Sequence, residues 1–186
     1  ILFNNPYGDT GMTSKLKTDV LETVSGSGTI ALTNQLSGMT SASVPSGSVI
    51  QVVNGSTAQE VTSSSNTPAD TGLTATITPT SASNYILVDV KHTGLSKYGG
   101  SSADTYFNLS LLRGASVIAV IEARAGYTNN SQYLFMGGSG ITFKDSPSST
   151  SAVTYKTQFN RGNGNGNVRV GDVNSVATIT LMEIKG

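Results

Sequence analysis

Cysteine and tryptophan are both absent from this sequence of 186 residues, which excludes disulfide bonds and metal sites built on thiolates. Aromatic residues make up only 6% of the chain, so a deep sugar-binding cleft lined by stacked rings is not expected. The chain has a single histidine, His92, and a metal centre built on several histidines is therefore excluded. We expect neither a cofactor nor a bound metal.

Charged residues are also scarce, and the 11 basic and 11 acidic residues give a formal net charge of zero. Such a surface cannot hold nucleic acid or an anionic membrane by its electric field, because that binding depends on the phosphates neutralised. No apolar run reaches membrane-spanning length, and no signal sequence opens the chain. We expect no nucleic-acid binding and no membrane insertion, whereas a near-neutral surface suits a protein that self-assembles.

What the chain does contain is the pattern of β-strands. Apolar and β-branched residues alternate with polar ones through its later two-thirds, and clusters of Gly, Asn, Ser and Pro interrupt them. The predicted strands are Ser48–Val53, Gln59–Thr62, Leu73–Thr78, Tyr85–Thr93, Thr105–Arg113, Val117–Ala123, Gln132–Met136, Gly140–Lys144, Ala152–Asn160, Asn167–Val170 and Val176–Ile184. These predict an all-β fold, an antiparallel β-sandwich resembling a jelly roll, with an extended N-terminal segment.

Two of the predicted strands are apolar on both faces. In the last strand Leu181 points to one face, while Met182 and Ile184 point to the other, and the segment Tyr85–Val90 behaves in the same way. One face would pack against the second sheet of the sandwich. The other face needs a different cover, and a neighbouring subunit is one candidate.

The beginning of the chain has a different character. It contains one predicted short helix, Ser14–Thr23, followed by a stretch from Gly26 to Ser48 that is rich in Gly, Ser and Thr. That stretch buries too little apolar surface to fold alone, so it is a linker or a stalk that orders when chains pair. We assign residues 1–47 to an attachment or stalk segment and residues 48–186 to a head. Because the first residue is Ile1 rather than Met, we expect the start to have been removed or processed.

The glycine-rich segment Arg161–Asn167, with the sequence RGNGNGN, raises the question of a phosphate or ion site. A dinucleotide fingerprint would require glycine at position 167, and the segment leads into a strand rather than a helix. Asn-Gly steps supply the positive φ angles that tight hairpins require. We therefore predict a hairpin tip between strands that end at Asn160 and begin at Asn167, and expect it at the exposed end.

Catalysis by paired carboxylates depends on which acids the fold brings together. The candidates are Asp89, Glu122, Asp145, Asp172 and Glu183. A Ser-His-Asp triad would have to use His92, which we expect instead at a strand end or an interface. Asp145 is expected to cap a turn, and Glu183 to face solvent or to pair with Arg161, Arg169 or a base of a neighbouring chain. We predict that the protein is not an enzyme.

Several polar loops carry the residue types with which proteins read sugars or other proteins, although ordinary exposed loops contain them too. The candidates for receptor-facing residues are Tyr98, Tyr127, Asn129, Asn130, Arg161, Asn163 and Asn165. No catalytic, cofactor-binding or metal-binding residue is predicted.

Four motifs follow one another in the order TGLTATITPTSASNYILVDVKHTG, FNLSLLRGASVIA, DSPSSTSAVTYKTQF and TITLMEI. This succession, from about Ser48 to Lys185, resembles a C-terminal β-sandwich domain of tail-fibre and related virion-fibre proteins of tailed bacteriophages, especially marine and cyanobacterial phages. The most specific motifs are DSPSSTSAVTYKTQF and TITLMEI. The residues that the resemblance carries over are structural: Leu112, Arg113 and Gly114 at a strand end, Asp145, Ser146 and Pro147 in a turn, Tyr155 and Phe159 in the core, and Met182 and Ile184 in the last strand.

The resemblance implies a virion protein, assembled in the cytoplasm of a bacterial host and usually trimeric. Its head would attach to a glycan or protein of the host surface, and its N-terminal segment would bind other virion proteins. One alternative is a capsid-decoration or head-fibre protein whose main contacts are to other virion proteins. A third hypothesis is a polysaccharide-cleaving depolymerase tip.

Overall fold

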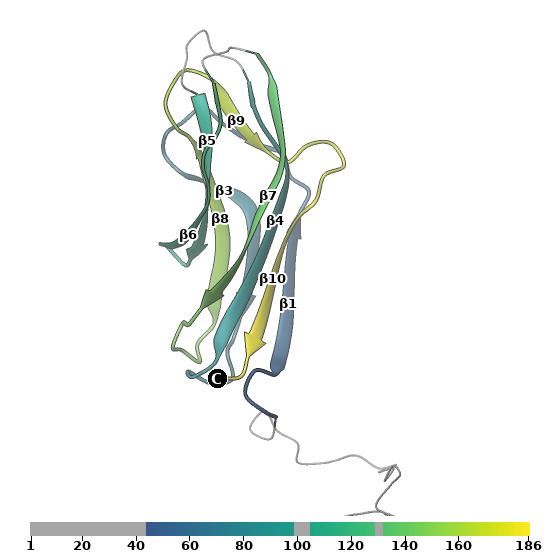
Figure 1. Ribbon diagram of the computed structural model, residues 1–186, viewed down its shortest axis with the longest axis vertical. Coiled ribbons are helices and arrows are strands. Elements are labelled where there is room, and N and C mark those ends of the chain that lie inside the picture. Colours follow the sequence, from purple (N-terminus) through teal and green to yellow (C-terminus); the bar gives the residue numbers. More distant parts are fainter. Residues whose placement is uncertain (1–43, 99–104, 129–131) are drawn as a thin grey trace, which may run out of the picture. The chain divides into compact units, whose positions relative to one another are not determined.

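The computed structural model describes residues 44–98, 105–128 and 132–186, and these form ten strands and no helix. The strands are β1 (Val49–Thr57), β2 (Val61–Ser63), β3 (Ala69–Ile77), β4 (Tyr85–Tyr98), β5 (Thr105–Arg113), β6 (Ser116–Thr128), β7 (Leu134–Asp145), β8 (Val153–Arg161), β9 (Asn167–Val170) and β10 (Ala177–Ile184). The all-β prediction is confirmed (Figure 1). The predicted helix at Ser14–Thr23 and most of the predicted N-terminal segment lie outside the described residues.

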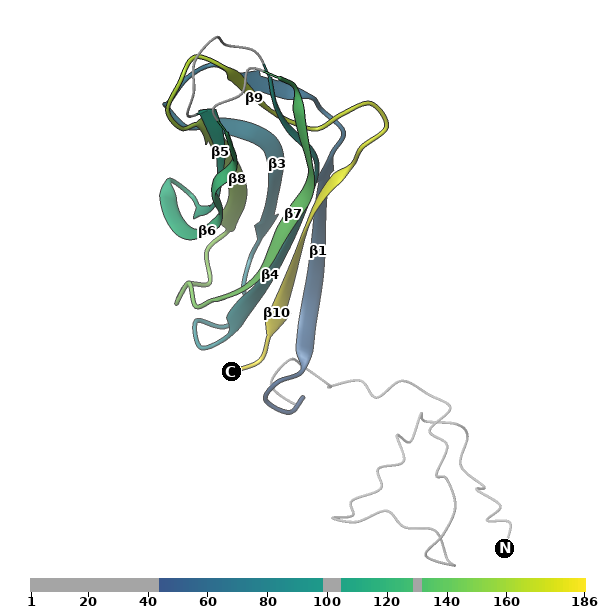
Figure 2. The same cartoon turned by 45° about the horizontal axis from the view of Figure 1, so that its top comes forward.

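The strands form two antiparallel sheets that face each other (Figure 2). Sheet A has the order β1-β10-β4-β9-β2, with β7 on the other edge of β4, and sheet B has the order β3-β8-β5-β6. Ser96 and Lys97 of β4 pair with both β7 and β9, so β9 lies on the edge of β4 opposite to β7. On that edge of β4, β9 lies in line with β10 and pairs with the later part of β4. In the same way, β2 lies in line with β1.

In the order of the chain, the first strand therefore pairs with the last, the second with the last but one, and so on. The interrupted strand β1/β2 pairs with β9/β10, β3 with β8, β4 with β7, and β5 with β6. With each interrupted pair counted once, this is the strand order of an eight-stranded jelly roll. The predicted jelly-roll-like sandwich is thus the observed architecture.

The core lies between the sheets and consists of two apolar clusters. The larger one includes Ile86, Val88 and Val90 of β4, whose alternation with Leu87 and Asp89 follows the period of a half-buried strand. The smaller one contains the rings of Phe107 and Phe159, with centroids 5.9 Å apart, as well as other buried residues of β4, β5 and β9. Phe159 and Tyr155 are both buried, as the resemblance implied.

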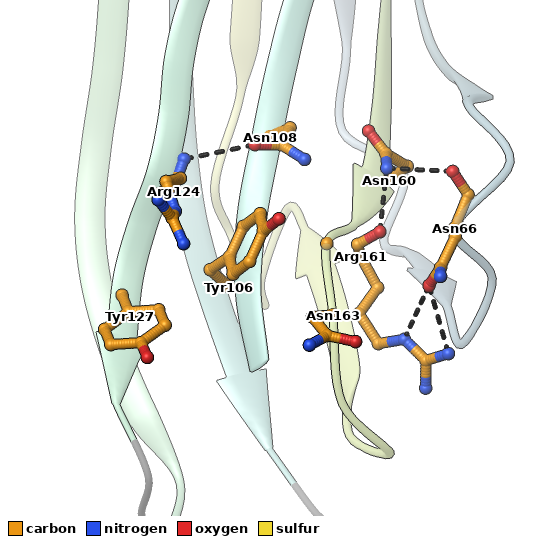
Figure 3. Close-up of a pocket in the computed structure, with 9 residues that line it drawn as sticks. Asn66, Tyr106, Asn108, Arg124, Tyr127, Asn160, Arg161 and Asn163 are labelled. Atoms are coloured by element: carbon orange, nitrogen blue, oxygen red, sulfur yellow. Dashed lines mark hydrogen bonds between the residues drawn. The ribbon is translucent and has the colours of Figure 1, made fainter. Parts of the chain in front are cut away.

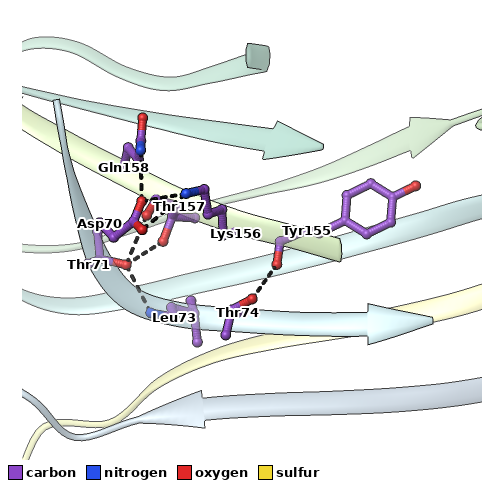
Figure 4. Close-up of polar contacts among 8 residues, drawn as sticks. All are labelled: Asp70, Thr71, Leu73, Thr74, Tyr155, Lys156, Thr157 and Gln158. Atoms are coloured by element: carbon purple, nitrogen blue, oxygen red, sulfur yellow. Dashed lines mark hydrogen bonds and ion pairs between the residues drawn. The ribbon is translucent and has the colours of Figure 1, made fainter. Parts of the chain in front are cut away.

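A polar chain crosses the core between the two sheets. The ring Nε2 of His92 lies 2.9 Å from the hydroxyl of Thr157, which lies 2.6 Å from the hydroxyl of Thr71. Thr71 belongs to a bulge of β3 beside β8, where its hydroxyl also accepts the N–H of Leu73 (Figure 4). His92 is buried, and burial lowers its pKa to about 4. The prediction of a strand-end or interface histidine was wrong: it is a neutral core residue.

Two of the candidate acids are also built into the fold. Glu183 is fully buried and accepts hydrogen bonds from Gln51, Thr80 and Asn84, so the expectation of a solvent-facing or arginine-paired residue was wrong. Burial raises the pKa of Glu183, but the bonds from Asn84, Gln51 and Thr80 outweigh it and hold the pKa below its ordinary value.

Asp145, predicted to cap a turn, ends β7 and joins two other strands. It binds the guanidinium of Arg113 at 2.9 Å and accepts the hydroxyl of Tyr155 at 2.6 Å. Burial and this carboxylate raise the pKa of Tyr155. The three residues fasten the ends of β5 and β7 to β8.

One predicted break in the strands does not exist. The sequence MGGSG suggested a turn between two short strands, but β7 runs through it without ending. A Cβ atom on Gly140 would lie 2.3 Å from the carbonyl oxygen of Val90, and one on Gly138 would lie 2.8 Å from that of His92. These glycines permit close approach to β4, and Gly137, with φ at +82°, lies beside a register shift.

The chain enters and leaves the head at the same end. The backbone N–H of Gly47 donates to the carbonyl of Lys185, and the N–H of Lys185 donates to the carbonyl of Ser48. We call this end the base. The strands β4, β6 and β8 run from the base toward the opposite end, which we call the tip (Figure 1).

Candidate functional site

A pocket of about 430 Å³ opens on the outer face of sheet B near the tip (Figure 3). Its volume falls within the range of about 300–1,000 Å³ that is typical of small-molecule sites. The pocket is lined by Asn66, Tyr106, Asn108, Arg124, Tyr127, Asn160, Arg161, Gly162 and Asn163. We call it the tip pocket, and most of its lining is amide, phenol or guanidinium.

The alternation of β5 supplies two of these residues. Phe107 and Leu109 point into the core, so Tyr106 and Asn108 point outward. Asn108 stands directly opposite Asn160 of β8 in the sheet register, which places their two amides side by side on the outer face.

A strained backbone places the first of the two cations. Arg124 of β6 has φ at +60°, a left-handed conformation that is uncommon for any residue other than glycine. Its N–H donates to the side-chain oxygen of Asn108 at 3.1 Å, where the β5–β6 pairing shifts register. The guanidinium carbon then lies 5.2 Å from the ring centroid of Tyr106 and 5.5 Å from that of Tyr127. Strain of this kind gathers at functional sites.

In the described part of the chain, the groups that hold the second cation are all neutral. The Nε and Nη2 groups of Arg161 donate to the side-chain oxygen of Asn66 at 3.2 and 3.1 Å, and Nη1 donates to the carbonyl of Gly166 at 3.1 Å. Asn160 donates to the backbone carbonyls of Asn66 and Arg161, which fixes this wall of the pocket. These contacts orient the guanidinium without neutralising its charge.

The glycine-rich segment forms another wall. The N–H of Gly162 donates to the carbonyl of Tyr106 at 2.8 Å, and a Cβ atom on Gly162 would lie 1.8 Å from the ring of Tyr106. The predicted hairpin tip was wrong, because β8 belongs to sheet B and β9 to sheet A. The segment is instead a connection between the sheets, with Gly164 at φ +90° and the N–H of Gly166 bound to the Thr105 hydroxyl.

Among the described residues, the charge in the tip pocket is uncompensated. The other two arginines of the chain have acidic partners, since Arg113 pairs with Asp145 and Arg169 pairs with Glu60 and Asp172. Within the ranges that the structure describes, neither Arg124 nor Arg161 has a carboxylate partner, and no Asp or Glu lines the pocket. A concave surface with this charge favours an anionic ligand.

A second depression, of about 450 Å³, lies over β4 and β7. Its charged groups neutralise each other, because Lys91 pairs with Asp89 at 3.1 Å, and Asp89 also accepts the hydroxyl of Thr142. It therefore lacks the uncompensated charge of the tip pocket.

The structure brings together three of the predicted receptor-facing residues, namely Tyr127, Arg161 and Asn163. Asn165 is exposed on the same connection but does not line the pocket. Tyr98 ends β4 and stacks on Tyr133, with ring centroids 5.2 Å apart, away from the pocket. Asn129 and Asn130 lie outside the described residues.

The prediction missed six lining residues from β5, β6, β8, the segment before β3 and the connection after β8, which are Asn66, Tyr106, Asn108, Arg124, Asn160 and Gly162. The alternation of β5 carried a signal for Tyr106 and Asn108, because both stand between inward-facing apolar residues. Arg124 carried no such signal, because its position depends on a register shift that depends on tertiary structure.

In the described part of the chain, no group of three or more His, Asp or Glu residues is arranged to hold a metal ion, and no helix is long and apolar enough to cross a membrane. The fold and site together define a jelly-roll head with a cationic, amide-rich pocket at its tip. No known protein-family model matches the chain, and no curated protein matches it significantly.

Proposed function

We propose that the protein is a fibre-type virion protein of a tailed bacteriophage and that its head attaches the particle to a glycan of the host surface. The observation that carries the proposal is the tip pocket, which lies at the end of the head opposite to the base. The described chain begins at Val44, whose carbonyl accepts a bond from Lys185 at the base, so an attachment to other virion proteins at the base leaves the tip pocket accessible. The sequence resemblance to phage fibre domains agrees with this arrangement.

The free hydrogen-bonding groups of the pocket suit a sugar. Among the described contacts, the amide nitrogen of Asn108, the side-chain oxygen of Asn160 and the side-chain amide of Asn163 are unused. Sugar hydroxyls need both donors and acceptors, which side-chain amides supply. The exposed ring of Tyr127 adds a flat apolar surface.

Attachment by such a pocket gains strength from several copies of the head on one particle. We propose that the heads form trimers through sheet A, whose outer face carries the apolar row Val52, Met182 and Leu87 across three strands. Val52 is 53% exposed, and Leu87 and Met182 are half-buried. The sequence analysis expected an apolar face that needs a cover such as a neighbouring subunit, and this row agrees with that expectation.

The same row supports the second candidate function, a capsid-decoration protein that contacts other virion proteins through sheet A. The two functions differ in what the tip pocket does. A decoration protein does not need the pocket to engage a cell.

The test uses the full chain, labelled with a fluorophore, on a panel of cyanobacterial and other marine bacterial strains and on their purified surface polysaccharides. The matched variants are Asn108→Ala, in the pocket, and Thr76→Ala, which is exposed on sheet B outside it. We expect binding to at least one strain, lost in Asn108→Ala and retained in Thr76→Ala. Equal binding by both variants, or binding to no strain while purified capsids capture the chain, would contradict host attachment through this pocket.

A further inference from the structure

The tip pocket holds two arginine side chains that the fold orients but does not neutralise. We propose that it binds an acidic sugar, a pyranose that carries a carboxylate, with the carboxylate on Arg124 and the hydroxyls on the surrounding asparagines and on Arg161. This inference rests on the proposed glycan attachment and specifies its ligand.

The way in which each arginine is held leaves donors for an anion. Arg124 contacts the faces of the Tyr106 and Tyr127 rings, and a guanidinium that stacks by its face keeps its N–H groups at its edge. Within the described residues, no acceptor binds these N–H groups. Arg161 uses Nε, one N–H of Nη1 and one of Nη2 on Asn66 and Gly166, so its remaining N–H donors stay unused.

The partners of both arginines are neutral, which matters for affinity. A carboxylate already paired with the guanidinium would have to be displaced by the ligand, as at Arg113 or Arg169. Among the described residues no carboxylate contacts either guanidinium, so a ligand anion has none of these to displace. Guanidinium and carboxylate match as two parallel hydrogen bonds, and charge-assisted bonds of this kind are stronger than neutral ones.

The rest of the lining favours a sugar over a simple anion. Four asparagines surround the arginines, namely Asn66, Asn108, Asn160 and Asn163. Two of these amides are fixed, because Asn108 accepts the backbone N–H of Arg124 and Asn160 donates to two carbonyls. A pocket preorganised in this way loses little side-chain entropy when hydroxyls bind.

The main experiment compares matched ligands by calorimetry with the full chain. The probes are methyl glucuronoside and methyl galacturonoside, the neutral methyl glucoside and galactoside, and the corresponding 6-sulfated glycosides. We expect a uronoside to bind at least about tenfold more tightly than its neutral partner, and affinity to fall as salt rises. Tighter binding of the sulfated than of the carboxylated sugars would overturn the carboxylate assignment, and equal binding of neutral and acidic sugars would overturn the acidic one.

The key variant is Arg124→Gln, because the exposed Arg124 guanidinium supports no hydrogen bond of the fold. We expect it to fold normally and to lose at least about tenfold in uronoside affinity, while Arg124→Lys keeps the charge but not the planar fork and recovers only part. The control is Lys91→Gln, which removes an exposed cation outside the pocket and leaves affinity unchanged. Unchanged affinity in Arg124→Gln would overturn the assigned contact.

Failure of this inference is distinguishable from failure of the attachment function. If Asn108→Ala abolishes cell binding but neutral sugars compete as well as uronosides, the proposed attachment is retained and the proposed specificity for acidic sugars is refuted. If Asn108→Ala binds cells like the unchanged chain, the attachment through this pocket itself is wrong.

Discussion

The ring of Tyr106 occupies the space in which a side chain at position 162 would lie, and the N–H of Gly162 donates to the carbonyl of Tyr106 at 2.8 Å. Ring and loop can approach this closely only because residue 162 has no Cβ atom. Tyr106 in turn supports the guanidinium of Arg124. A glycine in the connection between the two sheets therefore sets the position of a cation on another strand.

Gly162→Ala should displace the Tyr106 ring, destabilise the head by about 1–3 kcal/mol through overpacking and disrupt the tip pocket. The measurement is urea unfolding together with glycan binding. The double variant Gly162→Ala/Tyr106→Ala should be less destabilised than the sum of the single variants. For comparison, Gly114→Ala at the base meets no atom within 4 Å but has φ at +58°, so it tests backbone strain alone. Unchanged stability in Gly162→Ala would show that the ring moves freely.

His92 should make the stability of the head depend on pH between about 6.5 and 4. Its pKa is about 4 in the folded chain and 6.5 in the unfolded chain, so in this window the unfolded state binds the extra proton. Stability is complete above pH 6.5 and falls on acidification, by about 3 kcal/mol at most. Urea unfolding at pH 7 and pH 4.5 measures the loss.

The matched variant for this prediction is His92→Gln, which cannot titrate. It should be less stable than the unchanged chain at pH 7 but should show a smaller loss on acidification. The pKa values of Asp70, Asp89 and Glu183 are all below their ordinary values of 3.8 to 4.5, so those carboxylates lose their contribution at lower pH. An identical loss in both chains would refute the assignment to His92.

Glu183→Ala should be among the most damaging single substitutions in the last strand. It would leave the donors of Gln51, Thr80 and Asn84 without their acceptor in a buried site, at a cost of about 3 kcal/mol or more. Glu60→Ala removes an acid whose side chain is 46% exposed and whose partner Arg169 also pairs with Asp172, and it should change stability by less than about 1 kcal/mol. Comparable midpoints of denaturation for the two variants would contradict this account.

Leu87→Lys tests self-association through sheet A. Leu87 points outward between Met182 and Lys144, so the substitution should leave the fold intact while placing a charge in the apolar row. We expect a trimer for the unchanged chain in sedimentation velocity and a monomer for Leu87→Lys. Thr76→Lys, on the outer face of sheet B, should remain trimeric. A monomeric unchanged chain at micromolar concentration would sink the trimer.

The architecture could be predicted from the sequence because the alternation of apolar and polar residues places the apolar side chains on one face of each strand. Phe159 and Tyr155 fall on one face of their strand by the alternation, and both are buried, as the resemblance implied. The breaks between strands were harder to predict, because glycine occurs both in turns and where two strands approach closely. In β7, Gly138 and Gly140 permit close contact with β4, whereas composition alone suggested a turn.

The buried polar residues could not be predicted from the sequence, for a different reason. The environment of His92 is set by Thr157 and Thr71, which are distant in sequence, and that of Glu183 by residues more than ninety positions away. Half of the tip pocket is likewise assembled by contacts that sequence patterns do not show. Asn108 and Arg124 meet through a register shift, and no local pattern encodes which residues a shift brings together.

At the base, the chain arrives at Gly47 and departs at Lys185 through a pair of backbone contacts, 2.8 and 2.9 Å long. The head is thus a loop of chain whose two ends almost touch, and it can be spliced into a surface turn of an unrelated carrier without stretching either side. Such a graft would present the tip pocket outward on any scaffold that tolerates an insertion. The head thereby becomes a portable module for displaying the tip pocket on a chosen particle.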